Sequence, residues 1–427
     1  MRKRLMGMFL AALLLIPGMA LAGAGAEQTP VEVMVNGFSL EGELRVEEGI
    51  ALVAVESFCR SVFGGGRCAV DDSAPLAGSV LCRWAEDGSG TLTITRSGDT
   101  GEPEQTLTLE LGSAVLRTGG ASSGEVRMDR PLEWADGAAW APLEPVAKAL
   151  GFQVRRSGET ICLEREKRRV TVRSLEEFLN AVGDDTEITL APGVYDFGAL
   201  EPEKIQNPLV LIDYEVFNTE TGSWYGGDRW QAVIRQVRDL TIRASGVTFS
   251  TPWAYADVLR FQDCRRVTLT GATAVHEVEP GHCTGNCLEL TGCGSFRAED
   301  CVLDGSGAYG LCAVDSRDVT LRDCEIANCT YGALELEGSR EILLTDCRIH
   351  DCLNCFGLVS AADCAGVLIQ DCALEGNTAN SLASSGGSTG VCFQNCTFRN
   401  DRFGTVNEYG WQESGGAVLV DCVWQDP

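Results

Sequence analysis

The densest group of side chains with chemical potential lies between residues 276 and 287. This segment holds two of the three histidines of the protein, His276 and His282. It also holds two carboxylates and two thiols, namely Glu277, Glu279, Cys283 and Cys287. Imidazole and thiolate groups bind zinc and copper, and a histidine beside carboxylates can transfer protons. The segment therefore has three candidate roles: a functional groove, a metal site, or a structural loop, which is the simplest of the three.

Acid–base chemistry on a sugar would need a pair of carboxyl groups, or a base beside a stabilising cation. The candidate catalytic residues are Asp257, His276, Glu277 and Glu279. The candidate substrate-binding residues are Trp253, Tyr255, His282, Tyr309 and Tyr331. Tyr309, Tyr331 and Phe356 each precede a glycine. Facing outward they would form a strip suited to a sugar face, whereas facing inward they would form an ordinary aromatic ladder, the interpretation that we favour here.

Cysteines recur at a regular spacing in the second half of the chain. Of 20 cysteines, 16 follow residue 263. Six of them end similar motifs 23 to 26 residues apart: Cys301, Cys324, Cys347, Cys372, Cys396 and Cys422. Stacked strands hold their Cβ atoms about 4.8 Å apart, whereas a disulfide prefers about 3.8 Å. We therefore predict mostly reduced interior columns, with local disulfides and metal ligation as the alternatives.

An acidic or amide residue precedes each of these six cysteines. The row is Asp300, Asp323, Asp346, Asp371, Asn395 and Asp421. Clustered carboxylates bind calcium, but Asp and Asn also favour tight turns, where their side chains hydrogen-bond the backbone. We expect turns here, and we predict neither a metal nor a cofactor.

The repeat itself indicates the architecture of residues 170–427. Each copy has three short alternating runs in 22 to 26 residues, which is one coil of a right-handed single-stranded parallel β-helix. Alternation places Val319, Leu321 and Cys324 inside the coil. This half resembles the β-helix repeat proteins of the pectate-lyase-like superfamily. The resemblance implies the fold and leaves the chemistry open, because residues 170–427 lack the paired-Asp, Gly-His-Gly and Arg-x-Lys signatures of polygalacturonases.

Residues 29–166 predict a smaller α+β repeat domain. Residues 46–58 and 134–151 each read as a turn, a strand and a short amphipathic helix. Together with the turn at Val35-Asn36-Gly37 and a closing strand after Gly151, they resemble the copper amine oxidase N-terminal-like domain. That resemblance implies an attachment or stalk module. The stretch contains no histidine, so we do not expect a copper site.

The beginning of the chain has the pattern of a secretory signal peptide. Arg2, Lys3 and Arg4 precede a short apolar run and small residues up to Ala26. We therefore predict cleavage of residues 1–26, export to the medium or cell surface, and no membrane insertion afterwards. The formal charge of −27 argues against nucleic acid and anionic lipid as partners.

Three functions are compatible with these patterns. The leading hypothesis is an exported, cell-surface β-helix protein that binds glycans or cell-envelope polymer. The first alternative is a carbohydrate-active enzyme, either a polysaccharide lyase or a glycoside hydrolase. The second is a metal-handling β-helix that uses the 276–287 segment.

Overall fold

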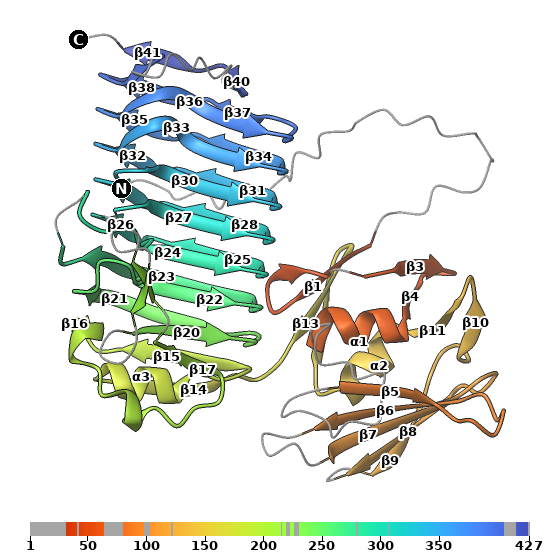
Figure 1. The fold of residues 1–427 in the computed structure, drawn as a ribbon. Helices are drawn as coiled ribbons and strands as arrows, with labels where there is room; N and C mark the ends of the chain where they lie inside the picture. Colours follow the sequence, from red (N-terminus) through yellow and green to blue (C-terminus); the bar gives the residue numbers. More distant parts are fainter. Residues whose placement is uncertain are drawn as a thin grey trace, which may run out of the picture.

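The computed structural model shows a strand-rich protein with a parallel β-solenoid in its C-terminal part, preceded by an N-terminal domain of sheets (Figure 1). It describes residues 31–40, 42–63, 80–97, 103–120, 123–214, 216–218, 223–225, 230–278, 281–305, 307–404 and 416–425. The predicted signal peptide lies outside these ranges. In the part of the chain that is described, no helix is long and apolar enough to cross a membrane.

In its described residues, the N-terminal domain contains three small sheets and two α-helices. One sheet joins β1 (Glu32–Val35), β2 (Phe38–Ser39), β12 (Gln153–Ser157) and β13 (Thr160–Glu164); the second joins β3 (Leu44–Glu47), β4 (Ile50–Ala54), β10 (Glu133–Ala135) and β11 (Ala138–Pro142). The third is an antiparallel sheet of β5 (Val80–Trp84), β6 (Thr91–Ser97), β7 (Pro103–Glu110), β8 (Val115–Gly120) and β9 (Gly124–Arg127). The helices are α1 (Val55–Phe63) and α2 (Leu143–Ala149).

The two similar sequence stretches form a matched pair in this domain. In each, a strand runs directly into a helix: β4 into α1, and β11 into α2. The two strands pair antiparallel, with Ala141 opposite Val53. Both helices bury their apolar face against one shared core, as the amphipathic patterns predict.

The solenoid begins at β14 (Arg168–Val172) under a capping helix, α3 (Leu175–Ala181). Ser174 caps α3, because its Oγ accepts a hydrogen bond from the backbone N–H of Glu177 at 3.2 Å. The first coils contain β15 (Thr186–Leu190), β16 (Gly193–Asp196), β17 (Val210–Asp213), β20 (Gln231–Arg235), β21 (Thr241–Thr251), β22 (Leu259–Gln262) and β23 (Arg265–His276). A separate hairpin joins β18 (Val216–Asn218) and β19 (Ser223–Tyr225), and short 3₁₀ turns lie at Phe197–Ala199 and Pro202–Lys204.

Later coils each contribute one strand to each of three stacked columns (Figure 1). One column contains β25 (Gly294–Glu299), β28 (Arg317–Arg322), β31 (Arg340–Thr345), β34 (Ala365–Gln370), β37 (Val391–Gln394) and β40 (Ala417–Val420). The next contains β26 (Val302–Asp304), β29 (Glu325–Ala327), β32 (Arg348–His350), β35 (Ala373–Glu375), β38 (Thr397–Arg399) and β41 (Val423–Gln425). The last contains β24 (Leu288–Thr291), β27 (Tyr309–Val314), β30 (Gly332–Glu337), β33 (Leu353–Ala362), β36 (Thr378–Gly386) and β39 (Arg402–Phe403).

The parallel register confirms the predicted repeat. Val319 lies opposite Ile342 and Ile342 opposite Val367, which are steps of 23 and 25 residues. Val319 and Leu321 are fully buried, and Cys324 is 2% exposed, as alternation predicts. Each coil therefore adds one layer of apolar side chains to a continuous core.

The cysteines form the predicted interior columns. The thiol of Cys347 lies within hydrogen-bonding reach of the thiols of Cys324 and Cys372 in the neighbouring coils. Contact with the thiol of Cys329, together with burial, raises the pKa of Cys352, which lies in another column, well above its ordinary value. No disulfide is present among the cysteines whose side chains the structure describes. They act as small apolar groups that satisfy backbone carbonyls.

Alkylation of the native, unreduced protein tests this arrangement. We expect the column thiols to resist iodoacetamide while the protein is folded, because they are buried. After unfolding without reductant, mass spectrometry is expected to find nearly every thiol alkylated. Thiols that stay blocked until a reductant is added would show that disulfides are present and would contradict the interior-column interpretation.

The acidic row occupies turns rather than a calcium site. Asp323, Asp346 and Asp371 have φ values of 51°, 55° and 54°, and the rest of the row lies in the same left-handed region. Asn and Asp tolerate this conformation better than most residues because their short side chains bond the local backbone. The recurrence of these residues is thus explained by the corner that each coil must turn.

Candidate functional site

One outer face of the solenoid carries a polar side chain at the same position in six successive coils. Parallel register stacks the members of this polar column in the order Arg260, Glu289, Cys312, Glu335, Ser360 and Ser384. They lie on β22, β24, β27, β30, β33 and β36. The residues on either side of each along its strand point into the core: Leu288 and Leu290, which flank Glu289, are fully buried. The strands therefore hold the polar column at a fixed spacing.

A carboxyl pair lies at the N-terminal end of this column. Asp257, 8% exposed, lies beside the carboxylate of Glu289, and Arg260 contacts both carboxyl groups. Its Oδ1 accepts a bond from the backbone N–H of Asn286 at 2.8 Å. Burial, reinforced by Glu289, raises the pKa of Asp257 well above its ordinary value.

Glu289 is held by donors on both sides. Arg260 Nη2 lies 3.2 Å from its Oε1, and Asn286 Nδ2 donates to its Oε2 at 3.1 Å. Thr291 Oγ1 donates to Oε1 at 3.2 Å. The pair is therefore a preorganised set of hydrogen-bonding groups on rigid strands.

Further along the column, Cys312 lies between Glu289 and Glu335. Its Sγ donates to Glu335 Oε2 at 3.8 Å. Burial and the surrounding carboxylates raise the pKa of this thiol, which makes it a poor nucleophile at neutral pH. Burial also raises the pKa of Glu335, with smaller contributions from Glu337 and Glu289. The column thus places two carboxylates, Glu289 and Glu335, on either side of a neutral thiol.

Two tyrosines stand beside the polar column and face outward. Tyr331 is 44% exposed, Tyr309 is half-buried, and their ring centroids lie 6.4 Å apart. The expected inward ladder is wrong at these positions. A Cβ added to Gly310 would lie 2.4 Å from Cγ2 of the buried Ile326, so only glycine fits at this inward position. The side chain of the preceding residue, Tyr309, therefore points away from the core. The side chain of Phe356 lies outside the described residues.

The sequence-predicted catalytic group does not come together. His276 is 4% exposed, and its Nε2 lies 2.9 Å from the carbonyl oxygen of Ala256. Burial lowers the pKa of this imidazole. Glu277 instead accepts a hydrogen bond from Ser250 Oγ at 2.9 Å, and Glu279 lies outside the described residues. Of the predicted set, Asp257 alone is shown at the polar column.

The predicted binding residues divide into two groups. Tyr309 and Tyr331 border the polar column. Trp253 packs edge-on against Trp230, with ring centroids 5.8 Å apart, and Tyr255 is half-buried in the same turn before β22. His282 is exposed at the turn before β24.

The 276–287 segment shows the features of a structural loop. Cys283 and Cys287 are buried, at 2% and 0% exposure, while His282 points to solvent. Burial raises the pKa of Cys283 to about 11. Among the described residues, no three His, Cys, Asp or Glu side chains are placed to hold a metal ion.

Sequence reasoning missed Arg260, Asn286, Glu289 and Glu335. The pattern that could have revealed the two glutamates lies in the third strand of each repeat. There, an apolar residue, a variable residue and a second apolar residue recur in that order. Aligning Leu288-Glu289-Leu290 with Leu334-Glu335-Leu336 places both glutamates in the polar column. The cysteine motif drew attention to the other two strands instead.

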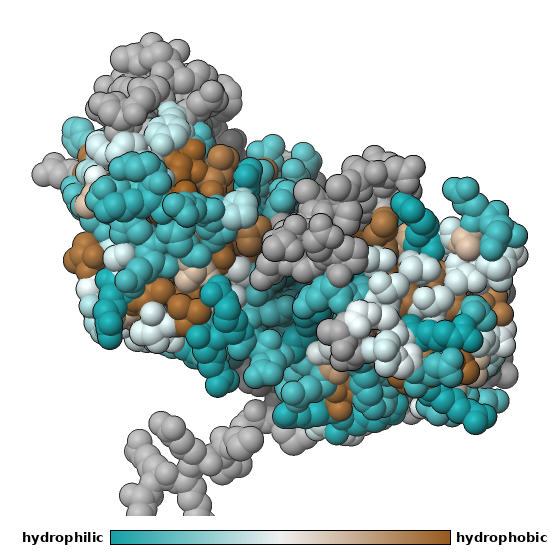
Figure 2. Space-filling view, turned by 90° about the horizontal axis from the view of Figure 1, so that it is seen from below, coloured by the Kyte–Doolittle hydropathy of each residue, from teal (hydrophilic) through white to brown (hydrophobic). Residues whose placement is uncertain are grey.

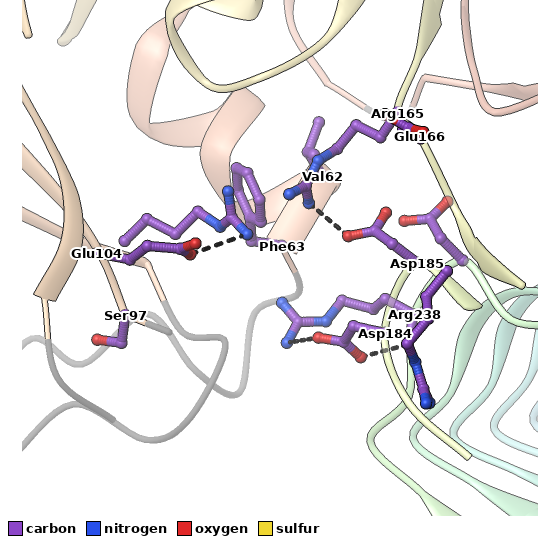
Figure 3. A pocket seen from close by; sticks show the side chains of 12 residues that line it. Val62, Phe63, Ser97, Glu104, Arg165, Glu166, Asp184, Asp185 and Arg238 are labelled. Carbon is purple, nitrogen blue, oxygen red and sulfur yellow. Dashed lines mark hydrogen bonds and ion pairs between the residues drawn. The ribbon is translucent and has the colours of Figure 1, made fainter. Parts of the chain in front are cut away.

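A second polar site lies between the N-terminal domain and the solenoid. It is a cavity of about 280 Å³, and Figure 2 shows a largely hydrophilic hollow between the two parts. Figure 3 shows Arg165, from the linker after β13, facing Asp185, from the turn before β15; their closest atoms are 2.6 Å apart. Arg238 pairs with Asp184 at 2.9 Å. Both ion pairs line the cavity, and the Arg165–Asp185 pair joins the two parts.

Asp185 makes the stability of this junction depend on pH. Burial raises its pKa to about 6, and Asp239 and Asp184 add to the rise while Arg165 and Arg96 oppose it. Lys167 and Arg238 also lie close by. Because the folded pKa exceeds the unfolded one, the native state takes up a proton below pH 6. The contribution of Asp185 to stability is therefore present near pH 4 and lost as the pH rises to 6.

Asp185→Asn is expected to remove this dependence. The wild type should lose on the order of 2 kcal/mol from this group between pH 4 and 6, and the variant should lose less over that range. Urea unfolding at several pH values measures both slopes, and exposed Asp136→Asn in the N-terminal domain is the control. Identical slopes for wild type and Asp185→Asn would contradict the assignment.

Comparison with known proteins identifies the repeat region. Residues 263–421 match the family described as right handed beta helix region. No curated protein sequence matches the chain. The matched region thus covers the coils that carry the polar column from Glu289 onward and both tyrosines.

Solved structures similar to this β-helix differ widely from it in sequence. A pectate lyase from Bacillus subtilis is 10% identical, covers 60% of this chain and 80% of its own, and has a TM-score of 0.35. A polygalacturonase from Erwinia carotovora is 11% identical, with coverages of 61% and 93% and a TM-score of 0.34. The surface adhesin PfbA of Streptococcus pneumoniae is 10% identical, with coverages of 61% and 82% and a TM-score of 0.30.

Proposed function

We propose that this protein binds glycans along the outer face that carries the polar column and the two tyrosines. The observation that carries the proposal is the aromatic pair of half-buried Tyr309 and exposed Tyr331, one coil apart, beside the hydrogen-bonded group of Asp257, Asn286 and Glu289. Aromatic faces pack on the apolar faces of sugar rings, while carboxyl and amide groups bind hydroxyls. Both kinds of group occur here on rigid strands.

Export and attachment complete the proposed role. The pattern of residues 1–26 supports secretion to the medium or the cell surface. The domain of residues 29–166, which resembles the copper amine oxidase N-terminal-like domain, would then act as an attachment or spacer module. The glycan partner would be a polysaccharide or a cell-envelope polymer that lies along the coils.

Binding fits the site better than catalysis does. Glycosidases keep their two carboxyl groups about 5–10 Å apart, with the sugar between them. Asn286 and Arg260 each contact both Asp257 and Glu289, so these two residues occupy the space that a sugar between the carboxyl groups would need. His276 is buried against a backbone carbonyl and supplies no base at this face. The lyase and hydrolase alternatives therefore have less support.

Tyr331→Ala tests the binding surface. Removing one stacking ring costs about 0.5–1.5 kcal/mol of binding free energy, so we expect a roughly three- to tenfold rise in Kd for the best ligand of a glycan array. Trp134→Ala removes another exposed aromatic, in the N-terminal domain, and should leave Kd unchanged. Equal affinity of wild type and Tyr331→Ala for a glycan that does bind would contradict this placement of the site.

A further inference from the structure

The charges beside the tyrosines point to a class of sugar. We propose that the polar column selects glycans that carry free amino groups, such as glucosamine polymers, over polyuronates. This inference rests on the proposed glycan binding at the same face and adds to it the chemistry of the preferred ligand.

The first support is an excess of carboxylates over cations at this face. Glu335 and Glu337 both point outward from β30, and among the described residues neither forms an ion pair. The nearby cation, Arg260, is already engaged, since its guanidinium contacts both Asp257 and Glu289, at 3.5 and 3.2 Å. A ligand ammonium group would find uncompensated carboxylates here, and a ligand carboxylate would not find a free cation.

The second support is the position of these carboxylates relative to the aromatic pair. Tyr331 immediately precedes β30, and Glu335 follows it by four residues. At about 3.3 Å per residue the two lie roughly 13 Å apart along the strand, which is within the length of a short oligosaccharide. A chain with one sugar stacked on Tyr331 can therefore place an amino group at Glu335.

The third support is electrostatic. Glu335 is half-buried, so solvent and salt screen its charge less than they screen a fully exposed carboxylate. Burial raises its pKa, and a bound ammonium group would oppose that effect by stabilising the ionised form. At long range, the net charge of −27 repels polyuronates and attracts polycations.

Titration of the full chain with three matched hexasaccharides tests the inference. The probes are glucosamine hexamer, its neutral N-acetylated form, and oligogalacturonate. We expect glucosamine hexamer to bind at least tenfold more tightly than oligogalacturonate, with the N-acetylated form between them. Glu335→Gln combined with Glu337→Gln should weaken the glucosamine hexamer about five- to tenfold and leave the neutral hexamer within twofold.

A matched control distinguishes the effect of removing charge at β30 from the effect of lowering the net charge of the protein. Glu299→Gln combined with Glu341→Gln makes the same charge change on another sheet, on β25 and β31, and should alter the Kd of glucosamine hexamer by less than twofold. Equal loss in both double variants, or oligogalacturonate as the tightest ligand, would overturn the amino-sugar preference while leaving glycan binding intact. Failure of all three probes and of a broad glycan array would contradict the proposed function itself.

Discussion

Arg266→Met is expected to lower the free energy of unfolding by about 3–5 kcal/mol. Arg266 on β23 is 5% exposed, and its guanidinium pairs with Asp239 at 2.9 Å. The same group donates to the carbonyl oxygens of Ser61, at 2.9 Å, and Val62 at the end of α1. The substitution would leave the Asp239 carboxylate buried beside a methionine and remove bonds that join the two domains.

The pH dependence of the loss identifies its cause. Arg266 holds the pKa of Asp239 below its ordinary value despite complete burial. A lowered folded pKa contributes stability above the unfolded pKa, and that stability is lost as the pH falls through the folded pKa. Arg266→Met should therefore lose most stability at neutral pH and less at acidic pH, where Asp239 can take up a proton.

Urea unfolding of a double-mutant cycle measures the pair directly. Asp239→Asn in the Arg266→Met background should recover part of the lost stability, because it removes the unpaired charge. Arg243→Met is the matched control: Arg243 is 54% exposed and pairs with Glu187 on the surface, so its loss should cost less than about 1 kcal/mol. Comparable losses for Arg266→Met and Arg243→Met would contradict the role assigned to the buried pair.

Phe296→Ala is the second large expected effect, again about 3–5 kcal/mol. Phe296 on β25 is 1% exposed and lies in register between Val267 and Val319 of the adjoining coils. Its ring meets that of Phe261 edge-on at 5.1 Å. Because strands above and below fix the backbone, the coil cannot collapse to fill the cavity.

Chemical denaturation measures this loss, and Phe296→Leu provides the control. Leucine retains most of the apolar volume and should cost less than about 1.5 kcal/mol. Hydrogen exchange should also quicken in β23 and β28, because each coil depends on its neighbours. A loss below 1 kcal/mol for Phe296→Ala would show that the coil interior repacks freely, contrary to this account.

The sequence predicts the coils well because the repeat encodes them directly. Cys301, Cys324 and Cys347 fall at one position of successive coils, and a one-residue slip would turn every buried side chain outward. The two strand-to-helix units of the N-terminal domain were also predictable from their patterns. Its five-stranded antiparallel sheet was not foreseen as a separate sheet, since local alternation does not say which strands pair.

The site was less predictable because it depends on contacts between coils. Glu289 meets Asp257 only when β24 lies beside β22, although 32 residues separate the two carboxylates along the chain. The outward turn of Tyr309 depends on Gly310 packing against Ile326 of the same coil. The spacing of His276 and Cys283 suggested chemistry, yet both side chains are buried as parts of the structural loop.

Hydrogen exchange of the full chain, with and without a saturating glycan, tests glycan binding at the polar column most directly. The ligand would be the tightest binder found on a glycan array. We expect the ligand to slow amide exchange at the starts of β24, β27 and β30, around Asn286, Tyr309 and Tyr331. Exchange in the N-terminal sheet of β5 to β9 should not change. Protection confined to the N-terminal domain, or to the opposite column of β25, β28 and β31, would contradict it.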